Sequence, residues 1–186
     1  TTFYIAKTNE QRQRYQKFDS TAYNLEPNLK NGPGGLRDIQ MILWVAQRHF
    51  GESSLLECLA SALITEKEYQ TLHQCRLFLW RVRFAMHLVT NSAEDRLLFN
   101  YQKSLVKMLG FNYPTPEIAV EKFMKVYFQH IKMIRELNEL LLQAFKEVIF
   151  IPKKNQVRVV DPFFQVTNQY LEISRSHYFK KYPCLL

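Results

Sequence analysis

Hydrophobic residues recur at helical spacing along most of the chain before residue 150. In the segment 36–50 the apolar residues fall three or four positions apart, which predicts a helix that begins between Leu36 and Asp38. A second helix is predicted from Thr65 to about Val89, and its apolar residues occupy two faces. One face carries Leu72, Leu79, Val82, Met86 and Val89, and the other carries Cys75, Phe78, Ala85 and Leu88. A helix that is apolar on two sides belongs in the middle of a bundle.

The longest periodic stretch predicts one continuous helix from Pro116 to about Phe150. Its buried stripe is expected to comprise Phe123, Tyr127, Ile131, Ile134, Leu141, Phe145 and Val148. A further amphipathic helix is expected in residues 1–18. These elements are typical of an all-α bundle with ordinary helix packing.

Several helix ends carry their own signals. Ser54 and Thr65 each stand three residues before a glutamate, as in a capping box, in which the two residues satisfy each other's backbone N–H groups. Thr115 precedes a proline and a glutamate, which suits the N-cap of the long helix. Gly110 suits the end of the helix before it.

The pattern changes after Pro152. Residues 156–174 are rich in β-branched and aromatic side chains, and Thr167-Asn168-Gln169 stands where a hairpin could turn. We therefore expect a mainly α protein, with a helical bundle over residues 1–151. Residues 152–186 are expected to form a small C-terminal β-ribbon and a linker toward a downstream domain that this chain lacks.

Composition narrows the range of partners. The 186 residues include 25 Lys and Arg against 17 Asp and Glu, a net charge of +8, which favours an anionic partner: nucleic acid, nucleotide phosphates or an acidic protein surface. No apolar run approaches the ~20 residues that span a membrane, so no membrane partner is expected. Cys58, Cys75 and Cys184 lack metal-ligand spacing and are expected to be buried, reduced thiols of a cytoplasmic protein.

A Gly-Pro-Gly-Gly stretch, residues 32–35, leads directly into the helix at Leu36. Glycines before a helix start can leave backbone N–H groups free in a region of positive potential, where a phosphate can approach closely. Lys30 and Arg37 flank that start and would add positive charge. One interpretation is therefore an anion cradle at the helix start.

The same residues also fit a plain loop. In that interpretation Asp38 is the N-cap of the helix and Arg37 pairs with Glu26. The stretch has neither the Walker A pattern nor the glycine spacing of dinucleotide-binding folds, so the glycines alone do not decide between the two interpretations.

A second cluster lies within the predicted helix 65–89. Arg76, Trp80, Arg83 and His87 share one helix face, at positions i, i+4, i+7 and i+11. They form either an anion-binding stripe or a polar seam that pairs with Glu94 and Asp95, or with another domain. The remaining histidines are expected to be surface or packing residues and not metal ligands: His49, His73, His130 and His177.

Three segments together resemble the bacterial PII uridylyltransferase/uridylyl-removing enzymes. They are TAYNLEPNLKNGPGGLRDIQMILWVAQRHFG (21–51), LFLWRVRFAMHLVTNSAEDRLLFNYQ (77–102) and ELNELLLQAF (136–145). The Gly-Gly-Leu-Arg-Asp-Ile core is also similar to an element of glutamine synthetase adenylyltransferases, which remain an alternative. The lead-in YNLEPNLK and the segment DRLLF favour the uridylyltransferases.

The resemblance implies a helical segment between an upstream nucleotidyltransferase domain and a downstream metal-dependent HD hydrolase domain, with glutamine-sensing ACT repeats in the same polypeptide. Such enzymes transfer UMP from UTP to a tyrosine of the PII signalling protein when glutamine is low, and remove it when glutamine is high. The resemblance and the helix-start geometry together indicate accessory contacts to UTP from Asn24, Lys30, Gly34, Gly35, Arg37 and Asp38. Asp38 would either cap the helix, which we favour, or orient Arg37.

Neither catalytic centre of such an enzyme is present in the sequence. The nucleotidyltransferase centre holds Mg²⁺ between two aspartates one residue apart, and the four aspartates include no such pair: Asp19, Asp38, Asp95 and Asp161. No histidine is followed by an aspartate, as the hydrolase centre requires. We therefore expect no catalytic residue and no metal ligand here. The Mg²⁺ ligands would lie outside this chain, which alone would be inactive.

Two rival functions come from other classes. The first is a basic helical nucleic-acid-binding module, which the scattered charge and the absence of a recognised nucleic-acid motif argue against. The second is a scaffold that only spaces catalytic domains. In that case UTP would bind equally well after replacement of Lys30 and Arg37.

Overall fold

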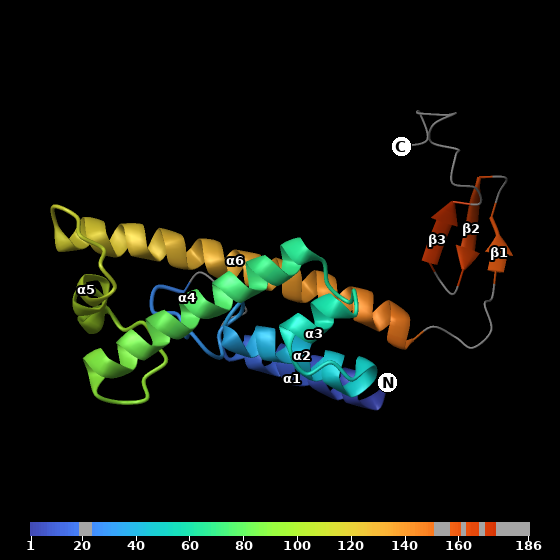
Figure 1. The fold of residues 1–186 in the computed structure, drawn as a ribbon, viewed down its shortest axis with the longest axis horizontal. Coiled ribbons are helices and arrows are strands. Elements are labelled where there is room, and N and C mark those ends of the chain that lie inside the picture. The colour runs from blue at the N-terminus through green and yellow to red at the C-terminus, as the bar shows by residue number, and fades with distance from the viewer. Residues whose placement is uncertain (19–23, 151–156, 161–162, 168–169, 174–186) are drawn as a thin grey trace. The chain divides into compact units, whose positions relative to one another are not determined.

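The computed structural model describes residues 1–18, 24–150, 157–160, 163–167 and 170–173. Figure 1 shows the helices α1 (Thr2–Gln16), α2 (Leu36–Phe50), α3 (Leu55–Ala60), α4 (Glu66–Thr90), α5 (Phe99–Met108) and α6 (Pro116–Ile149), and the strands β1 (Val157–Val159), β2 (Phe164–Thr167) and β3 (Tyr170–Ile173). The prediction of a mainly α protein with a small β-ribbon is confirmed.

The chain divides into two units. Residues 1–146 contain the helical bundle, and residues 147–186 contain the three strands. The predicted domain boundary, between residues 151 and 152, lies outside the described residues and stays a prediction. Among the described residues, no helix combines the length and the apolar character needed to cross a bilayer.

The capping signals place the helix starts. The Thr65 side chain accepts from the Glu68 N–H, and the Glu68 carboxylate accepts from the Thr65 N–H at 2.7 Å, so the capping box of α4 is complete. At α3 the Ser54 hydroxyl accepts from the Glu57 N–H, but the Glu57 carboxylate reaches back one residue further, to the Ser53 N–H. Both predicted starts are confirmed, the second with this change of partner.

The core is built mainly from α2, α4 and α6. On α4 the first predicted face is buried at Leu72, Leu79, Val82 and Met86 and half-buried at Val89. Leu88 is exposed, and the prediction that it belongs to a second buried face is wrong. Eleven residues separate Leu88 from the exposed Leu77, which is close to three helical turns, so both lie on the outer side.

The stripe of α6 is buried as predicted at every position except Val148, which is exposed. Val148 follows Lys146, the last residue of the bundle unit, so the packed core ends before it. The thiols of Cys58 and Cys75 are buried and free, and burial raises the pKa of each to about 11. Both thiols are therefore protonated at neutral pH. Cys184 lies outside the described residues.

The second unit is a three-stranded antiparallel sheet in the order β1-β2-β3. Val157 pairs with Thr167 across β1 and β2, and Thr167 pairs with Tyr170 across β2 and β3. The last of these pairs brackets the predicted hairpin turn, whose residues Asn168 and Gln169 lie outside the described residues.

Candidate functional site

The glycine stretch before α2 is buried, and its amides are bonded within the protein. Residues 32–36 are all buried. The Gly34 N–H donates to Asp38 Oδ2 at 2.6 Å, and the Gly35 N–H donates to the Gly32 carbonyl at 2.9 Å. The expectation that the amides of Gly34 and Gly35 point outward is therefore wrong, because the loop folds back onto itself and uses them.

Close packing explains why glycines stand there. Gly34 has a φ of +76°, a conformation that favours glycine, and a Cβ at this position would overlap the Ile131 backbone oxygen of α6. A Cβ at Gly35 would lie 2.9 Å from each of three carbonyl oxygens, including that of Lys30. The glycines let the loop lie directly against α6, and they do not make room for a ligand.

Asp38 is fully buried and is the centre of a polar network whose donors Gln11, Arg14 and Tyr15 are half-buried. Its Oδ1 accepts from Arg14 Nη2 at 2.6 Å and from Gln11 Nε2 at 3.1 Å, while its Oδ2 accepts from Tyr15 Oη and the Gly34 N–H, each at 2.6 Å. Burial, and then the negative charge of Asp38, raise the pKa of Tyr15 well above its usual range, so the phenol remains a donor. The carboxylate thus accepts from four donors. Such hydrogen bonding is needed to offset the cost of burying its charge.

The predicted roles of Asp38 need correction. The N-cap of α2 is Gly35, so Asp38 is not the N-cap, although its carboxylate does accept the loop amide of Gly34. Its ionic partner is Arg14, 24 residues earlier, and not Arg37. Asp38 therefore joins α1 to the start of α2. Its own backbone oxygen accepts from the buried Asn138, which adds α6 to the network.

Lys30 and Arg37 lie side by side at this corner. The Arg37 N–H donates to the Lys30 carbonyl at 2.9 Å, and both residues are half-buried. The Arg37 guanidinium lies 5.4 Å from the centre of the Trp44 ring, and the Lys7 ammonium lies 4.6 Å from the same ring. The alternative pairing of Arg37 with Glu26 is wrong, because Glu26 pairs with Arg96. Among the described residues, no carboxylate forms an ion pair with Lys30 or Arg37.

The lead-in to the glycine stretch pairs with a segment that the periodicity did not connect to it. Asn28 and Arg96 form an antiparallel bridge. The Leu29 N–H donates to the Asp95 carbonyl at 2.8 Å, and the Leu97 N–H donates to the Pro27 carbonyl at 2.9 Å. No local signal in the sequence predicts this pairing, although both segments carry the family resemblance.

The pairing of the Asn28 segment with the Arg96 segment also brings the second cluster close to the start of α2. Asp95 Oδ1 accepts from Arg83 Nε at 2.6 Å and lies 3.0 Å from His87 Nε2. Burial raises the pKa of Asp95, but hydrogen bonds and positive charge from Arg83 and His87 outweigh burial and leave the pKa below its usual value. For Arg83 and His87, the structure therefore shows the polar seam with Asp95. Glu94 instead accepts from the Arg96 N–H.

The remaining candidate residues lie apart from this seam. Arg76 stacks over Trp80, with its guanidinium carbon 5.5 Å from the ring centre. Asn24 accepts from the Glu26 N–H in a local turn, beside a hollow of about 10 Å³. That volume holds about one water molecule at most, so it is no nucleotide pocket.

The histidines within the described residues have packing partners or local contacts. His130 stacks on Phe78, with 4.0 Å between ring centres, and His73 stacks on Tyr69. His49 lies near the Phe3 ring, and burial lowers its pKa. Within the described residues, no three His, Cys, Asp or Glu side chains are grouped to hold a metal ion. His177 and two of the aspartates, Asp19 and Asp161, lie outside them.

Comparisons with known proteins agree on one family. The family described as GlnD PII-uridylyltransferase matches residues 2–142. The bifunctional uridylyltransferase/uridylyl-removing enzyme of Legionella pneumophila (strain Corby) is 46% identical over 181 residues, 97% of this chain and 21% of that protein. The enzymes with the same name from Pseudomonas aeruginosa (strain LESB58) and Stutzerimonas stutzeri (strain A1501) are 42% and 44% identical, over 99% and 97% of this chain.

This chain spans about one fifth of the length of these relatives. No solved structure matches it. The names of these relatives favour a uridylyltransferase over the adenylyltransferase alternative.

Proposed function

We propose a function from the premise that the chain belongs to the GlnD PII-uridylyltransferase family. In this proposal it is the helical segment of a bifunctional enzyme that transfers UMP from UTP to a tyrosine of the PII protein and removes it again, in cytoplasmic nitrogen signalling. The match of the family over residues 2–142 is the observation that carries the proposal.

The catalytic centres would lie in other domains of the same polypeptide. The sequence has no Asp-x-Asp pair and no His-Asp pair, so the upstream nucleotidyltransferase domain would hold Mg²⁺ and the downstream HD domain would remove UMP. The isolated 186-residue chain is then inactive in UMP transfer.

The contribution of this segment would come from the side chains of Lys30 and Arg37. Arg37 stands in the first turn of α2, where a cation opposes the helix dipole at a cost of about 0.3–1 kcal/mol. A triphosphate beside Arg37 would turn that cost into a gain. The buried amides of Gly34 and Gly35 take no part in this version of the site, and Asn24 and Asp38 support the loop and do not touch nucleotide.

The Asp38 network would hold those two cations in place. Arg14, which pairs with Asp38, also donates to the Asn31 carbonyl at 2.9 Å, directly after Lys30 in the chain. Arg14 thereby ties both the residue after Lys30 and the first turn of α2 to α1. Arg14 is therefore a positioning residue in this proposal.

The test uses the longer polypeptide with its nucleotidyltransferase domain. Arg37→Ala and Lys30→Ala should each raise the KM for UTP or lower kcat, while Arg48→Ala, an exposed arginine at the other end of α2, should change neither. Unchanged kinetics in both variants would leave the segment as a scaffold. Loss in the Arg48 variant as well would indicate a general effect of net charge.

A further inference from the structure

The outer side of α4 carries four large apolar side chains that the bundle does not cover. Leu77, Trp80, Phe84 and Leu88 are 49%, 55%, 67% and 57% exposed. Their positions, i, i+3, i+7 and i+11, place them on one face over about 16 Å of helix. We name these four residues the α4 outer stripe. Contiguous apolar surface of this kind marks interaction sites on soluble proteins.

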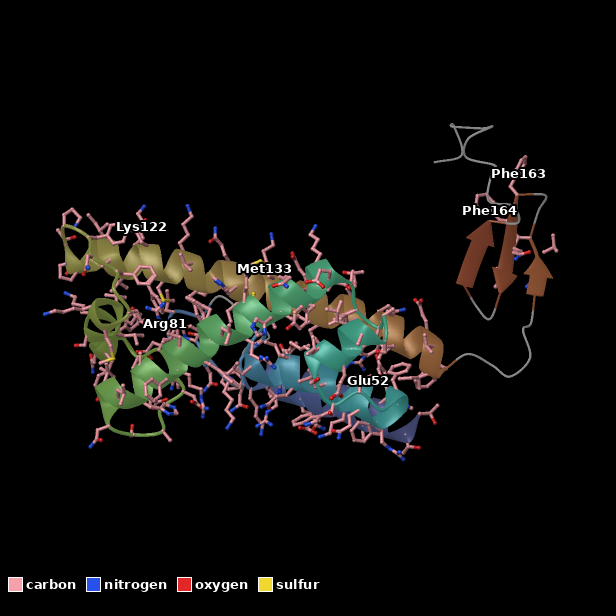
Figure 2. The ribbon with its side chains drawn as sticks, in the orientation of Figure 1. Glu52, Arg81, Lys122, Met133, Phe163 and Phe164 are labelled. Atoms are coloured by element: carbon pink, nitrogen blue, oxygen red, sulfur yellow. The ribbon has the colours of Figure 1, made fainter. Side chains whose placement is uncertain are left out.

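Positive charge borders the α4 outer stripe. Residues 69–93 contain no aspartate or glutamate. Arg76 lies over the Trp80 ring on one side of the stripe, and Arg81, which Figure 2 labels on α4, follows Trp80 toward the other side. The Arg81 guanidinium donates to the Leu109 carbonyl. Among the described residues, no carboxylate forms an ion pair with Arg81.

The acidic residues that follow this stretch do not neutralise the border. Asp95 is held by Arg83 and His87, and Glu94 accepts from the Arg96 N–H. An apolar ridge edged by arginines fits a partner that combines an apolar face with carboxylates. Trp and Arg are also the residues that contribute most strongly at protein interfaces.

We propose that the α4 outer stripe docks an amphipathic helix of a separate protein, with an apolar face over the four side chains and carboxylates opposite Arg76 and Arg81. The spacing of the stripe matches the anchors by which one helix recognises another. This proposal does not depend on the nucleotide site, because it concerns another helix and another ligand.

A second copy of this chain fits the stripe less well. A symmetric pair of α4 helices would place the arginines of one copy opposite those of the other, with no carboxylate in residues 69–93 to separate them. Single-stranded nucleic acid also fits less well. Bases stack on aromatic rings, but Leu77 and Leu88, at the two ends of the stripe, offer none.

The probe is a labelled synthetic peptide of about 18 residues, with leucines on one helical face and glutamates on the others. Titration with the 186-residue chain, followed by fluorescence anisotropy, should give saturable binding. The double variant Phe84→Ala/Leu88→Ala should weaken it roughly tenfold or more. Both side chains are mostly exposed, so the variant should keep the helical circular dichroism of the parent.

Two controls distinguish binding at the α4 outer stripe, and its dependence on charge, from nonspecific apolar binding. Leu140→Ala removes a leucine of matched exposure, 54%, from α6 and should leave the affinity unchanged. A peptide with lysines in place of the glutamates should bind at least about tenfold more weakly to the parent chain, and Arg81→Glu should narrow that difference.

Several results would overturn the proposal. They are the absence of saturable binding, equal binding of the lysine peptide, and an effect of Leu140→Ala as large as that of the double variant. Displacement of the peptide by oligothymidylate would assign the stripe to nucleic acid. Self-association of the parent chain in sedimentation, lost in the double variant, would assign it to a second copy.

Discussion

Two aspartates, Asp38 and Asp95, are each the centre of a polar cluster in the bundle, and they differ in how deeply they are buried. The Asp38 side chain is fully buried and joins α1 to α2 through Arg14. The Asp95 side chain is 15% exposed and joins Arg83 and His87 of α4. A buried carboxylate without its partners cannot be rescued by water, whereas a partly exposed one can. Removal of the carboxylate should therefore lower the free energy of unfolding far more at Asp38 than at Asp95, although the shortest arginine–carboxylate distance is 2.6 Å in both clusters.

Replacement of Asp38 should have the largest effect. Asp38→Ala leaves the guanidinium of Arg14, 12% exposed, without its carboxylate, and should cost about 3–5 kcal/mol of unfolding free energy. Urea unfolding followed by circular dichroism measures this loss. Arg14→Ala/Asp38→Ala should lose much less than the sum of the two single variants, because the residues act as a pair. Additive losses would show that the network is not a unit.

Replacement of Asp95 should have an intermediate effect that depends on pH. Asp95→Asn should cost about 1 kcal/mol near neutral pH, because solvent screens the cluster. The folded-state pKa of Asp95 lies below its ordinary value of 3.8, so the unfolded chain takes up the proton more readily. Its contribution is complete above about pH 4 and is lost as the pH falls through the lower folded-state value.

The difference in unfolding free energy between the parent chain and Asp95→Asn should therefore become smaller as the pH falls. Urea unfolding at a series of acidic pH values measures it. A difference that stays constant, or a loss as large as that of Asp38→Ala, would mean that exposure does not separate the two aspartates.

Replacement of Arg37 should have the smallest effect on stability. Arg37→Ala loses the contact with Trp44, which contributes about 0.5–1 kcal/mol. It also removes the unfavourable interaction of the Arg37 charge with the helix dipole, which is of similar size. Thermal melting should therefore hardly change, and the cost of this substitution should appear only in nucleotide kinetics. A large loss of stability would identify Arg37 as a structural residue like Asp38.

Local signals predicted most of the helices. Thr65 and Glu68 form a complete capping box with no help from the rest of the chain, so the start of α4 was readable from two residues. The 3.6-residue period predicts the extent of α6 but does not show where the bundle core ends, so it assigns the exposed Val148 to the core. The period likewise assigns the exposed Leu88 to the core, because it does not show that one apolar side of α4 stays uncovered.

The candidate site could be predicted only in part. Lys30 and Arg37 stand only seven positions apart, on either side of the glycine stretch, and the structure shows them side by side. The partner of Asp38 stands on another helix, and the partner of Leu29 lies in the segment of Asp95. Such pairs depend on how the helices pack, and hydrophobic spacing carries no information about them.

The bridge between Asn28 and Arg96 has a consequence for how this family can vary. It closes the chain on itself, so that α2, α3 and α4 form a cassette whose entrance and exit are neighbours. Insertions or deletions around α3, in the exposed connection near Glu52, would change the contour of the cassette and leave its anchoring points in place. Length variation among relatives should therefore gather inside the cassette, away from its two joined ends.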